Sequence, residues 1–167
     1  MLSIHLELLN KNRQEVLKKL AVFAKEAILG GGTALSLQLA HRYSYDFDLF
    51  FPRKIQREDF IKLRKISKIK KNKINNQEEL TVIIDKGIQI TLWHYPFKSV
   101  AKTIKTGFIA LLNYQDIGAD KSYTLGRRAV WRDYVDLFWL LKNTLSLSQL
   151  ITFSKRKFKK EFSEKQF

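Results

Sequence analysis

The sequence predicts an α+β fold, in which a small β-sheet is followed by a helical C-terminal third. Three observations predict it: short apolar runs with period-two alternation lie in the first two thirds, glycines separate some of them, and the last third has helical periodicity. The length of 167 residues suits one domain. We expect a single domain over 1–167, with a sheet-containing core in 1–110 and a helical part in 111–167.

Hydrophobic spacing locates the first elements. Apolar residues from Val16 to Ile28 recur at helical spacing and predict a helix over 14–25. The apolar residues 27–29 predict a short strand, which ends in the glycine turn 30–32. Thr33 is expected to cap the next helix, because a threonine hydroxyl accepts a hydrogen bond from a free N–H at a helix start.

The same patterns place the remaining elements. Residues 46–51 alternate, with Phe47, Leu49 and Phe51 on one face, and predict a strand that ends at Pro52. The other predicted elements are a helix over 58–71, a hairpin of residues 81–85 and 88–95 around a Lys86-Gly87 turn, a short strand over 108–112, and helices over 116–127, 133–142 and 148–162.

Composition excludes several classes of function. Lysine and arginine number 31 against 16 acidic residues, and the formal charge of +15 favours polyanionic partners such as nucleic acid. Basic residues gather in 53–73, 127–132 and 155–165, either as a binding surface or as solvated faces. The absence of cysteine excludes disulfides, thiolate metal sites and cysteine nucleophiles. No run of about 20 apolar residues predicts a membrane span, so we expect a cytoplasmic protein.

Two carboxylates on the predicted strand 46–51 form a candidate metal site. Asp46 and Asp48 are two residues apart, so they share a strand face and lie about 7 Å apart along it. Magnesium prefers carboxylate oxygens together with water and substrate phosphates. The alternative is a pair of surface acids on an edge strand.

The glycine turn before the helix is a candidate phosphate cradle. Glycine lets the backbone approach a ligand closely, and a helix start offers free N–H groups and a positive dipole end. The sequence lacks the lysine and hydroxyl of a Walker A loop. The alternative is a tight strand-to-helix turn.

Residues 30–50, GGGTALSLQLAHRYSYDFDLF, resemble the signature of the nucleotidyltransferase superfamily in its AbiEii/AbiGii toxin branch. That branch belongs to type IV toxin–antitoxin and abortive-infection systems, and its fold is a small mixed β-sheet flanked by helices. The matching positions are Gly31, Gly32, Thr33, Leu35, His41, Arg42, Ser44, Asp46 and Asp48.

Residues 116–141 resemble the second conserved block of the same branch. The matching positions are Asp116, Lys121, Arg127 or Arg128, Asp133 and Asp136. The resemblance implies that Asp46, Asp48, Lys121 and Asp133 are catalytic, that Asp46 and Asp48 hold Mg²⁺ or Mn²⁺, and that the nucleotide phosphates are bound by Gly31, Gly32, Thr33, Arg42, Ser44, Arg127 and Arg128. A lysine in such a cleft would neutralise charge on a transferring phosphoryl group. Asp133 alternatively caps a helix, and Lys121 is alternatively an exposed helix lysine.

One position departs from the superfamily. Its members often carry a third carboxylate on a later strand, where this chain has Thr91 between Gln89 and Trp93. Asp116 or Asp133 would supply the missing acid, or one metal ion would bind only with the nucleotide.

The resemblance implies a nucleotidyltransferase toxin that moves a nucleoside monophosphate from a nucleoside triphosphate to an acceptor and releases pyrophosphate. The expected acceptor is tRNA or another RNA, in agreement with the charge of +15, and a cognate antitoxin is the expected protein partner. The alternatives are transfer to a protein hydroxyl, a catalytically weakened relative that binds nucleotide or RNA, and a protein that acts only by binding its antitoxin.

Overall fold

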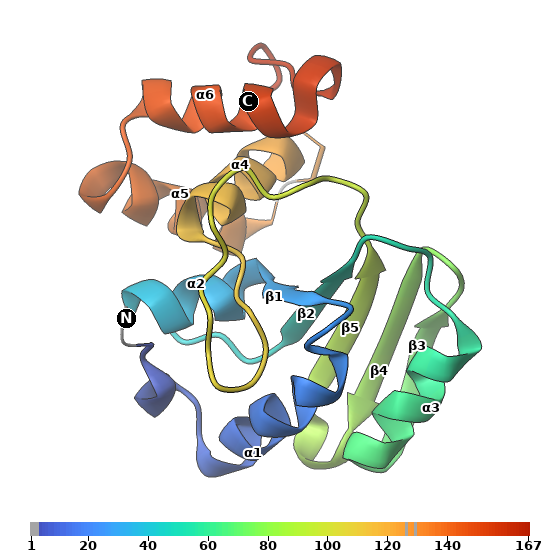
Figure 1. Cartoon of the computed structure of the whole chain (residues 1–167). Helices are drawn as coiled ribbons and strands as arrows, with labels where there is room; N and C mark the ends of the chain where they lie inside the picture. The colour runs from blue at the N-terminus through green and yellow to red at the C-terminus, as the bar shows by residue number, and fades with distance from the viewer. Residues whose placement is uncertain (1–3, 126, 129) are drawn as a thin grey trace. The chain divides into compact units, whose positions relative to one another are not determined.

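The computed structural model describes residues 4–125, 127–128 and 130–167. The chain divides into two compact units (Figure 1). The sheet unit comprises Met1–Pro96 and Ile104–Leu111, and the helical unit comprises Phe97–Thr103 and Leu112–Phe167. Among the described residues, no helix combines the length and the apolar character that a membrane span requires.

The sheet unit contains a five-stranded mixed sheet, which confirms the predicted fold class. The strands β2 and β5 are parallel, and the other neighbouring pairs are antiparallel. In spatial order the strands are β1 (Ile28–Gly30), β2 (Phe47–Phe51), β5 (Gln89–His94), β4 (Glu79–Ile84) and β3 (Ile69–Asn75).

Alternation along the strands decides which face of the sheet forms the core. Phe47, Leu49 and Phe51 of β2 are completely buried, as predicted, whereas Asp48 and Phe50 between them are partly exposed. Helix α1 (Lys11–Lys19) continues into a 3₁₀ turn, Leu20–Phe23, where the Phe23 ring meets the Phe51 ring edge-on at 5.6 Å between centroids. The apolar face therefore anchors β2 and leaves its carboxylate face available.

The predicted helix over 58–71 is wrong beyond Ile66. Helix α3 spans Arg57–Ile66 and is followed by β3, an edge strand whose side chains are almost all exposed. β3 is held by backbone hydrogen bonds to β4, and side chains on both of its faces are exposed. Its lysine-rich sequence therefore lacks the alternation of apolar and polar residues that predicts a strand. Exposed lysines on an edge strand also oppose pairing with another chain.

Two further local predictions differ from the structure. Helix α2 spans Gly31–Leu39 and its N-cap is Gly30, so Thr33 lies inside the first turn rather than at the cap. The predicted strand over 108–112 reduces to isolated bridges of Leu111 with Leu29 and with Ile104. The predicted hairpin is confirmed, with Lys86 and Gly87 in the connection between β4 and β5.

The helical unit contains the three helices predicted for the last third. They are α4 (Tyr114–Leu125), α5 (Trp131–Asn143) and α6 (Leu147–Phe158), the last followed by a 3₁₀ turn, Lys159–Glu161. Leu137, Leu145 and Leu150 form the core of the unit. Gly118 lets α4 approach α6, since a Cβ there would lie 3.1 Å from Leu150 Cδ1.

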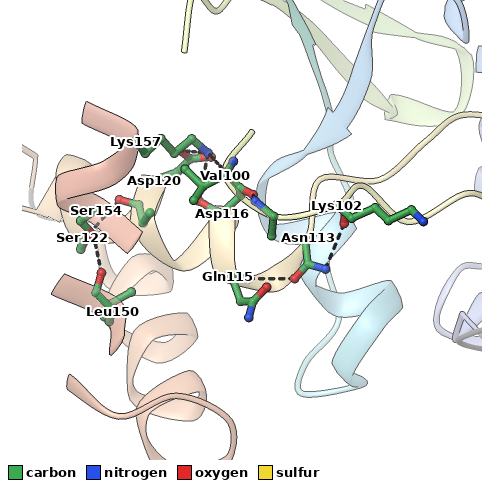
Figure 2. A network of polar contacts seen from close by, with 12 residues as sticks. Val100, Lys102, Asn113, Gln115, Asp116, Asp120, Ser122, Leu150, Ser154 and Lys157 are labelled. Atoms are coloured by element: carbon green, nitrogen blue, oxygen red, sulfur yellow. Dashed lines mark hydrogen bonds and ion pairs between the residues drawn. The ribbon is translucent and has the colours of Figure 1, made fainter. Parts of the chain in front are cut away.

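A buried ion-pair network joins α6 to α4 (Figure 2). The Lys157 side chain is fully buried, and its Nζ lies 3.0 Å from Asp116 Oδ1 and 2.8 Å from Asp120 Oδ1. Asp116 also accepts hydrogen bonds from the backbone N–H groups of Val100 at 2.9 Å and Ala101 at 2.8 Å. One lysine of the basic segment 155–165 is therefore part of the core.

Candidate active site

In the sheet unit, the carboxylate of Asp48 lies where three strands run side by side. The register pairs Asp48 with Gly30 of β1 on one side and with Thr91 of β5 on the other. The Trp93 indole Nε1 donates a hydrogen bond to Asp48 Oδ1 at 3.3 Å. A hydrogen bond from a fixed ring restricts the orientation of the carboxylate, as outer partners of metal-binding carboxylates do.

Gly31 brings the start of α2 against the same carboxylate. Its φ of +66° lies in the left-handed region that favours glycine. A Cβ at this position would overlap the carboxylate of Asp48, so only glycine permits the approach. A side chain at Gly32 would likewise come within 2.6 Å of Arg42 Nη2 and 3.1 Å of Ser44 Oγ.

Hydroxyl groups of α2 hold the loop that leads into β2. The Thr33 hydroxyl donates to the backbone carbonyl of Asp46 and lies 3.0 Å from Ser44 Oγ. One turn later, the Ser36 hydroxyl donates to the carbonyl of Arg42. Residues 42–46 are therefore fastened to α2 at two points, which fixes where the carboxylate strand begins.

The structure thus gathers one set of predicted residues around the start of α2. A helix start concentrates free N–H groups and a positive dipole end, and here a guanidinium and two hydroxyls lie beside it. The gathered residues are Gly31, Gly32, Thr33, Arg42, Ser44 and Asp48, with Asp46 attached through its backbone carbonyl.

The donor set suits a hard divalent cation that keeps water and substrate oxygens among its ligands. Among residues 4–125, 127–128 and 130–167, no three His, Cys, Asp or Glu side chains are grouped closely enough to hold a metal ion by themselves. Asp48 of β2 and Asp46, which directly precedes β2, are the candidate carboxylates, and Trp93 and Gly31 fix that of Asp48. Magnesium is commonly bound by one or two carboxylates plus phosphates, so these residues fit it.

The position of the third carboxylate holds a hydroxyl pair. Thr91 is directly beside Asp48 in register, and its Oγ1 lies 3.3 Å from Thr81 Oγ1 of β4. Glu79 lies on the same face of β4, where its carboxylate accepts from the Thr81 hydroxyl at 2.5 Å. Glu79 lies outside the strand predicted over 81–85, because β4 begins two residues earlier, where the alternation extends back to Glu79.

In the helical unit, Lys121 is buried between two aspartates of α5. Its Nζ lies 2.5 Å from Asp133 Oδ1 and 3.0 Å from Asp136 Oδ2, and both carboxylates are almost completely buried. Arg128 Nη2 lies 3.4 Å from Asp133 Oδ2. The N-cap of α5 is Val130, and Asp133 belongs to its first turn with its side chain directed to Lys121. Neither Lys121 as an exposed lysine nor Asp133 as the cap agrees with this arrangement.

Two other predicted residues have structural partners. Arg127 stacks over the Tyr123 ring, with Cζ 3.7 Å from the centroid, and donates to the carbonyls of Tyr123 at 2.8 Å and Glu161 at 2.9 Å. Asp116, considered above as a replacement for the third acid, is completely buried and bound by Lys157 and two backbone N–H groups.

Comparison with known proteins identifies the family. Residues 15–105, more than half of the chain, match the model of the family described as nucleotidyl transferase AbiEii toxin, type IV toxin–antitoxin system. The chain belongs to this AbiEii family. The matched segment includes the glycine start of α2, Asp46 and Asp48, and the second block at 116–141 lies beyond it.

Relatives of this AbiEii-family chain include an uncharacterized protein of Aquifex aeolicus, 28% identical over 159 residues, which cover 90% of the chain and 76% of that protein. Among solved structures, MenT4, a nucleotidyltransferase toxin of Mycobacterium tuberculosis, is similar with a TM-score of 0.61 and 16% identity over 86% of this chain and 61% of its own. JHP933 of Helicobacter pylori is similar with a TM-score of 0.59 and 16% identity over 85% of this chain and 69% of its own.

These findings agree on fold and on class of enzyme. The low identities of the solved structures establish a shared nucleotidyltransferase fold, and the family match places the chain among nucleotidyltransferase enzymes of toxin–antitoxin systems.

Proposed function

We propose that this AbiEii-family enzyme transfers a nucleoside monophosphate from a nucleoside triphosphate to an RNA acceptor, with tRNA 3′ ends as the preferred class. An acceptor hydroxyl oxygen attacks the α-phosphorus, the bond from that phosphorus to the bridging oxygen breaks, and pyrophosphate leaves. The observation that carries the proposal is the approach of Gly31 to the Asp48 carboxylate, which sets the N–H groups of a helix start beside carboxylate oxygens.

The residues of the sheet unit bind and orient the triphosphate. The free N–H groups at Gly31 and Gly32, with Arg42 and the Ser44 hydroxyl, provide donors for phosphate oxygens. Asp46 and Asp48 would hold Mg²⁺ or Mn²⁺, which when bound supplies positive charge that activates the acceptor oxygen and stabilises the leaving oxygen. The Thr33 hydroxyl holds the backbone carbonyl of Asp46, and the Trp93 indole orients the carboxylate of Asp48.

For the helical unit, the proposed role is charge stabilisation. Lys121 and Arg128 carry the positive charges, and Asp133 with Asp136 holds the Lys121 ammonium in one place. A fixed ammonium costs no reorganisation when charge develops on transferring phosphates. Arg127, tied to Tyr123 and the carbonyl of Glu161, then contributes mainly to the fold of the unit.

The net charge and the family support the choice of acceptor and partner. A charge of +15 on 167 residues favours RNA over a protein hydroxyl, because phosphate neutralisation releases counterions. A type IV toxin–antitoxin family implies a cognate antitoxin. We further propose that the enzyme acts in the cytoplasm.

A second candidate function is nucleotide or RNA binding without turnover. The hydroxyl pair Thr91–Thr81 at the position of the third carboxylate favours it, because hydroxyls are weaker metal ligands than a carboxylate. Labelled nucleotide that binds but is never incorporated, across four nucleotides and total RNA, would support this second candidate.

Removal of the two carboxylates tests the proposal. Asp48→Asn, and Asp46→Asn almost as strongly, should abolish incorporation of radiolabelled nucleotide into total RNA, because the metal then loses its oxygen ligands. The melting temperature should stay unchanged, because the apolar face of β2 holds the strand. Magnesium should no longer stabilise the variants in the presence of nucleotide.

Asp85→Asn is the matched control, because Asp85 lies in the β4–β5 connection, where its carboxylate pairs with Lys70 at 3.2 Å. It should retain full incorporation. Incorporation at the wild-type rate by the double variant of Asp46 and Asp48 would refute the nucleotidyltransferase mechanism proposed here.

A further inference from the structure

Helix α5 exposes four large apolar side chains on its outer face. Trp131 is 77% exposed, Tyr134 45%, Phe138 66% and Leu141 36%. These four residues are called the aromatic face below. The opposite side of the helix is buried through Asp133, Asp136, Leu137 and Leu140. An apolar cluster of this kind on a folded surface marks an interaction site.

The spacing of the aromatic face makes it one continuous stripe. Its members follow at intervals of three, four and three residues, so they lie on one side of the helix. The eleven residues from Trp131 to Leu141 span about 15 Å along the axis. Three of the four side chains are aromatic rings, which offer flat surfaces for stacking rather than an aliphatic groove.

The charges around the stripe select the partner. The exposed residues of α5 outside the aromatic face are Arg132, Lys142 and Asn143, whereas both acids of the helix point inward to Lys121. Lys142 Nζ lies 5.8 Å from the centroid of the Phe138 ring. A second copy of this chain would bring the same cations and another charge of +15, so self-association is opposed.

We propose that the aromatic face binds unpaired nucleotides of the RNA acceptor, whose bases stack on Trp131, Tyr134 and Phe138 while Arg132 and Lys142 meet the phosphates. Aromatic side chains interleaved with cations are the arrangement that single-stranded nucleic acid requires, because every base has a stacking surface and every link a negative charge. The inference rests on the RNA acceptor of the proposed function and assigns the surface that holds it.

Binding of a labelled single-stranded RNA, measured by fluorescence anisotropy, tests the assignment. The double variant Trp131→Ala/Phe138→Ala should bind at least about 10-fold more weakly than the wild type at every salt concentration, because two stacking surfaces are lost. Its dependence on salt should stay the same. The same RNA annealed to its complement should bind the variant almost as tightly as it binds the wild type, because paired bases cannot stack on side chains.

Two comparison variants separate stacking from charge and from general surface change. Arg132→Gln should lower the slope of log affinity against log salt by about 0.7, the contribution of one phosphate contact on a single strand. Leu147→Ala removes another exposed apolar side chain, 54% exposed at the start of α6, and should leave RNA affinity unchanged. Melting temperatures within two degrees (about 0.5 kcal/mol) of the wild type confirm that the exposed substitutions leave the fold intact.

The outcomes that overturn the inference differ from those that overturn the proposed function. Unchanged RNA affinity of the double variant would assign the aromatic face to a protein partner. If the wild type sediments as a dimer and the double variant sediments as a monomer, the aromatic face would be assigned to a second copy of the chain. If wild-type protein binds no RNA, the proposed acceptor is wrong as well, whereas nucleotide binding through Asp48, measured separately by thermal stabilisation, would survive that result.

Discussion

At Gly31, the absence of a Cβ allows the candidate site to form. The φ of +66° and the contact with the Asp48 carboxylate both require glycine, so any side chain would displace either the helix start or the carboxylate. Thr33 acts at the same scale, because its hydroxyl ties the carbonyl of Asp46 to α2. Two small residues therefore set the distance between the candidate phosphate and metal groups.

Trp93→Phe should weaken metal binding without removing the metal ligands. Phenylalanine keeps a ring in place but loses the indole N–H that donates to Asp48 Oδ1 at 3.3 Å. Loss of such an outer hydrogen bond typically costs about 10-fold or more in metal affinity. Titration of Mn²⁺ followed by electron paramagnetic resonance, with nucleotide present, measures the shift directly.

Trp139→Phe serves as the control, because it makes the same chemical change at a tryptophan other than the one that donates to Asp48. Its Mn²⁺ affinity should equal that of the wild type. If the Trp93 variant also binds Mn²⁺ as tightly as the wild type, the role of Trp93 is limited to packing.

At the scale of elements, helix α6 combines two kinds of lysine. Lys155 is exposed and pairs with Glu164, whereas Lys157 is buried against Asp116 and Asp120 of α4. The Phe158 ring stacks on Tyr123 of α4 with centroids 4.1 Å apart. The basic run at the end of the chain is thus partly a surface and partly a connection between helices.

Lys157→Met should destabilise the helical unit by about 3 kcal/mol or more. Methionine keeps the apolar stem, but the carboxylates of Asp116 and Asp120 lose the ammonium that compensates their burial. Urea denaturation monitored by circular dichroism gives the free energy of unfolding. Arg156→Ala, an exposed neighbour, should change it by about 0.5 kcal/mol or less. A similar small effect for both variants would mean that the buried ion pairs contribute little to stability.

At the scale of the whole molecule, the positive charge is spread over both units. In the sheet unit, part of it is neutralised locally: Arg53 pairs with Asp59 at 2.8 Å and also with Glu26, to which Lys62 binds as well. The hydrogen bonds from Lys62 and Arg53 hold the pKa of Glu26 below its ordinary value of 4.5. Lysines of β3 and the cations Arg132 and Lys142 of α5 are also exposed on the surface.

RNA binding should therefore weaken steeply with salt. Each phosphate neutralised on a single strand contributes a slope of about −0.7 in log affinity against log salt, so several contacts predict a total slope of about −3 or steeper. Filter binding or anisotropy over a series of salt concentrations measures it. A slope near zero would show that the charge is only a solvated surface and would contradict the choice of a polyanionic acceptor.

Local patterns in the sequence were sufficient for the fold class, most elements and the set of candidate residues around α2. The alternation in β2, the glycines before α2 and the helical spacing of the last third are short-range signals, and they predicted β2, the β4–β5 hairpin and three C-terminal helices. The edge strand β3 was not predicted, because its pairing depends on β4 rather than on its own side chains.

Only the tertiary structure decided which partner each polar side chain has. Lys121 and Asp133 are 12 positions apart and Lys157 and Asp116 are 41 apart, and spacing along the chain carries no information about such pairs. The same holds for Trp93 and Asp48, which meet because β2 and β5 run in parallel. The sequence by itself determined which polar groups are available and their order along the chain. Tertiary packing decided the distances between them, because a buried charge is costly unless a group of opposite charge lies beside it.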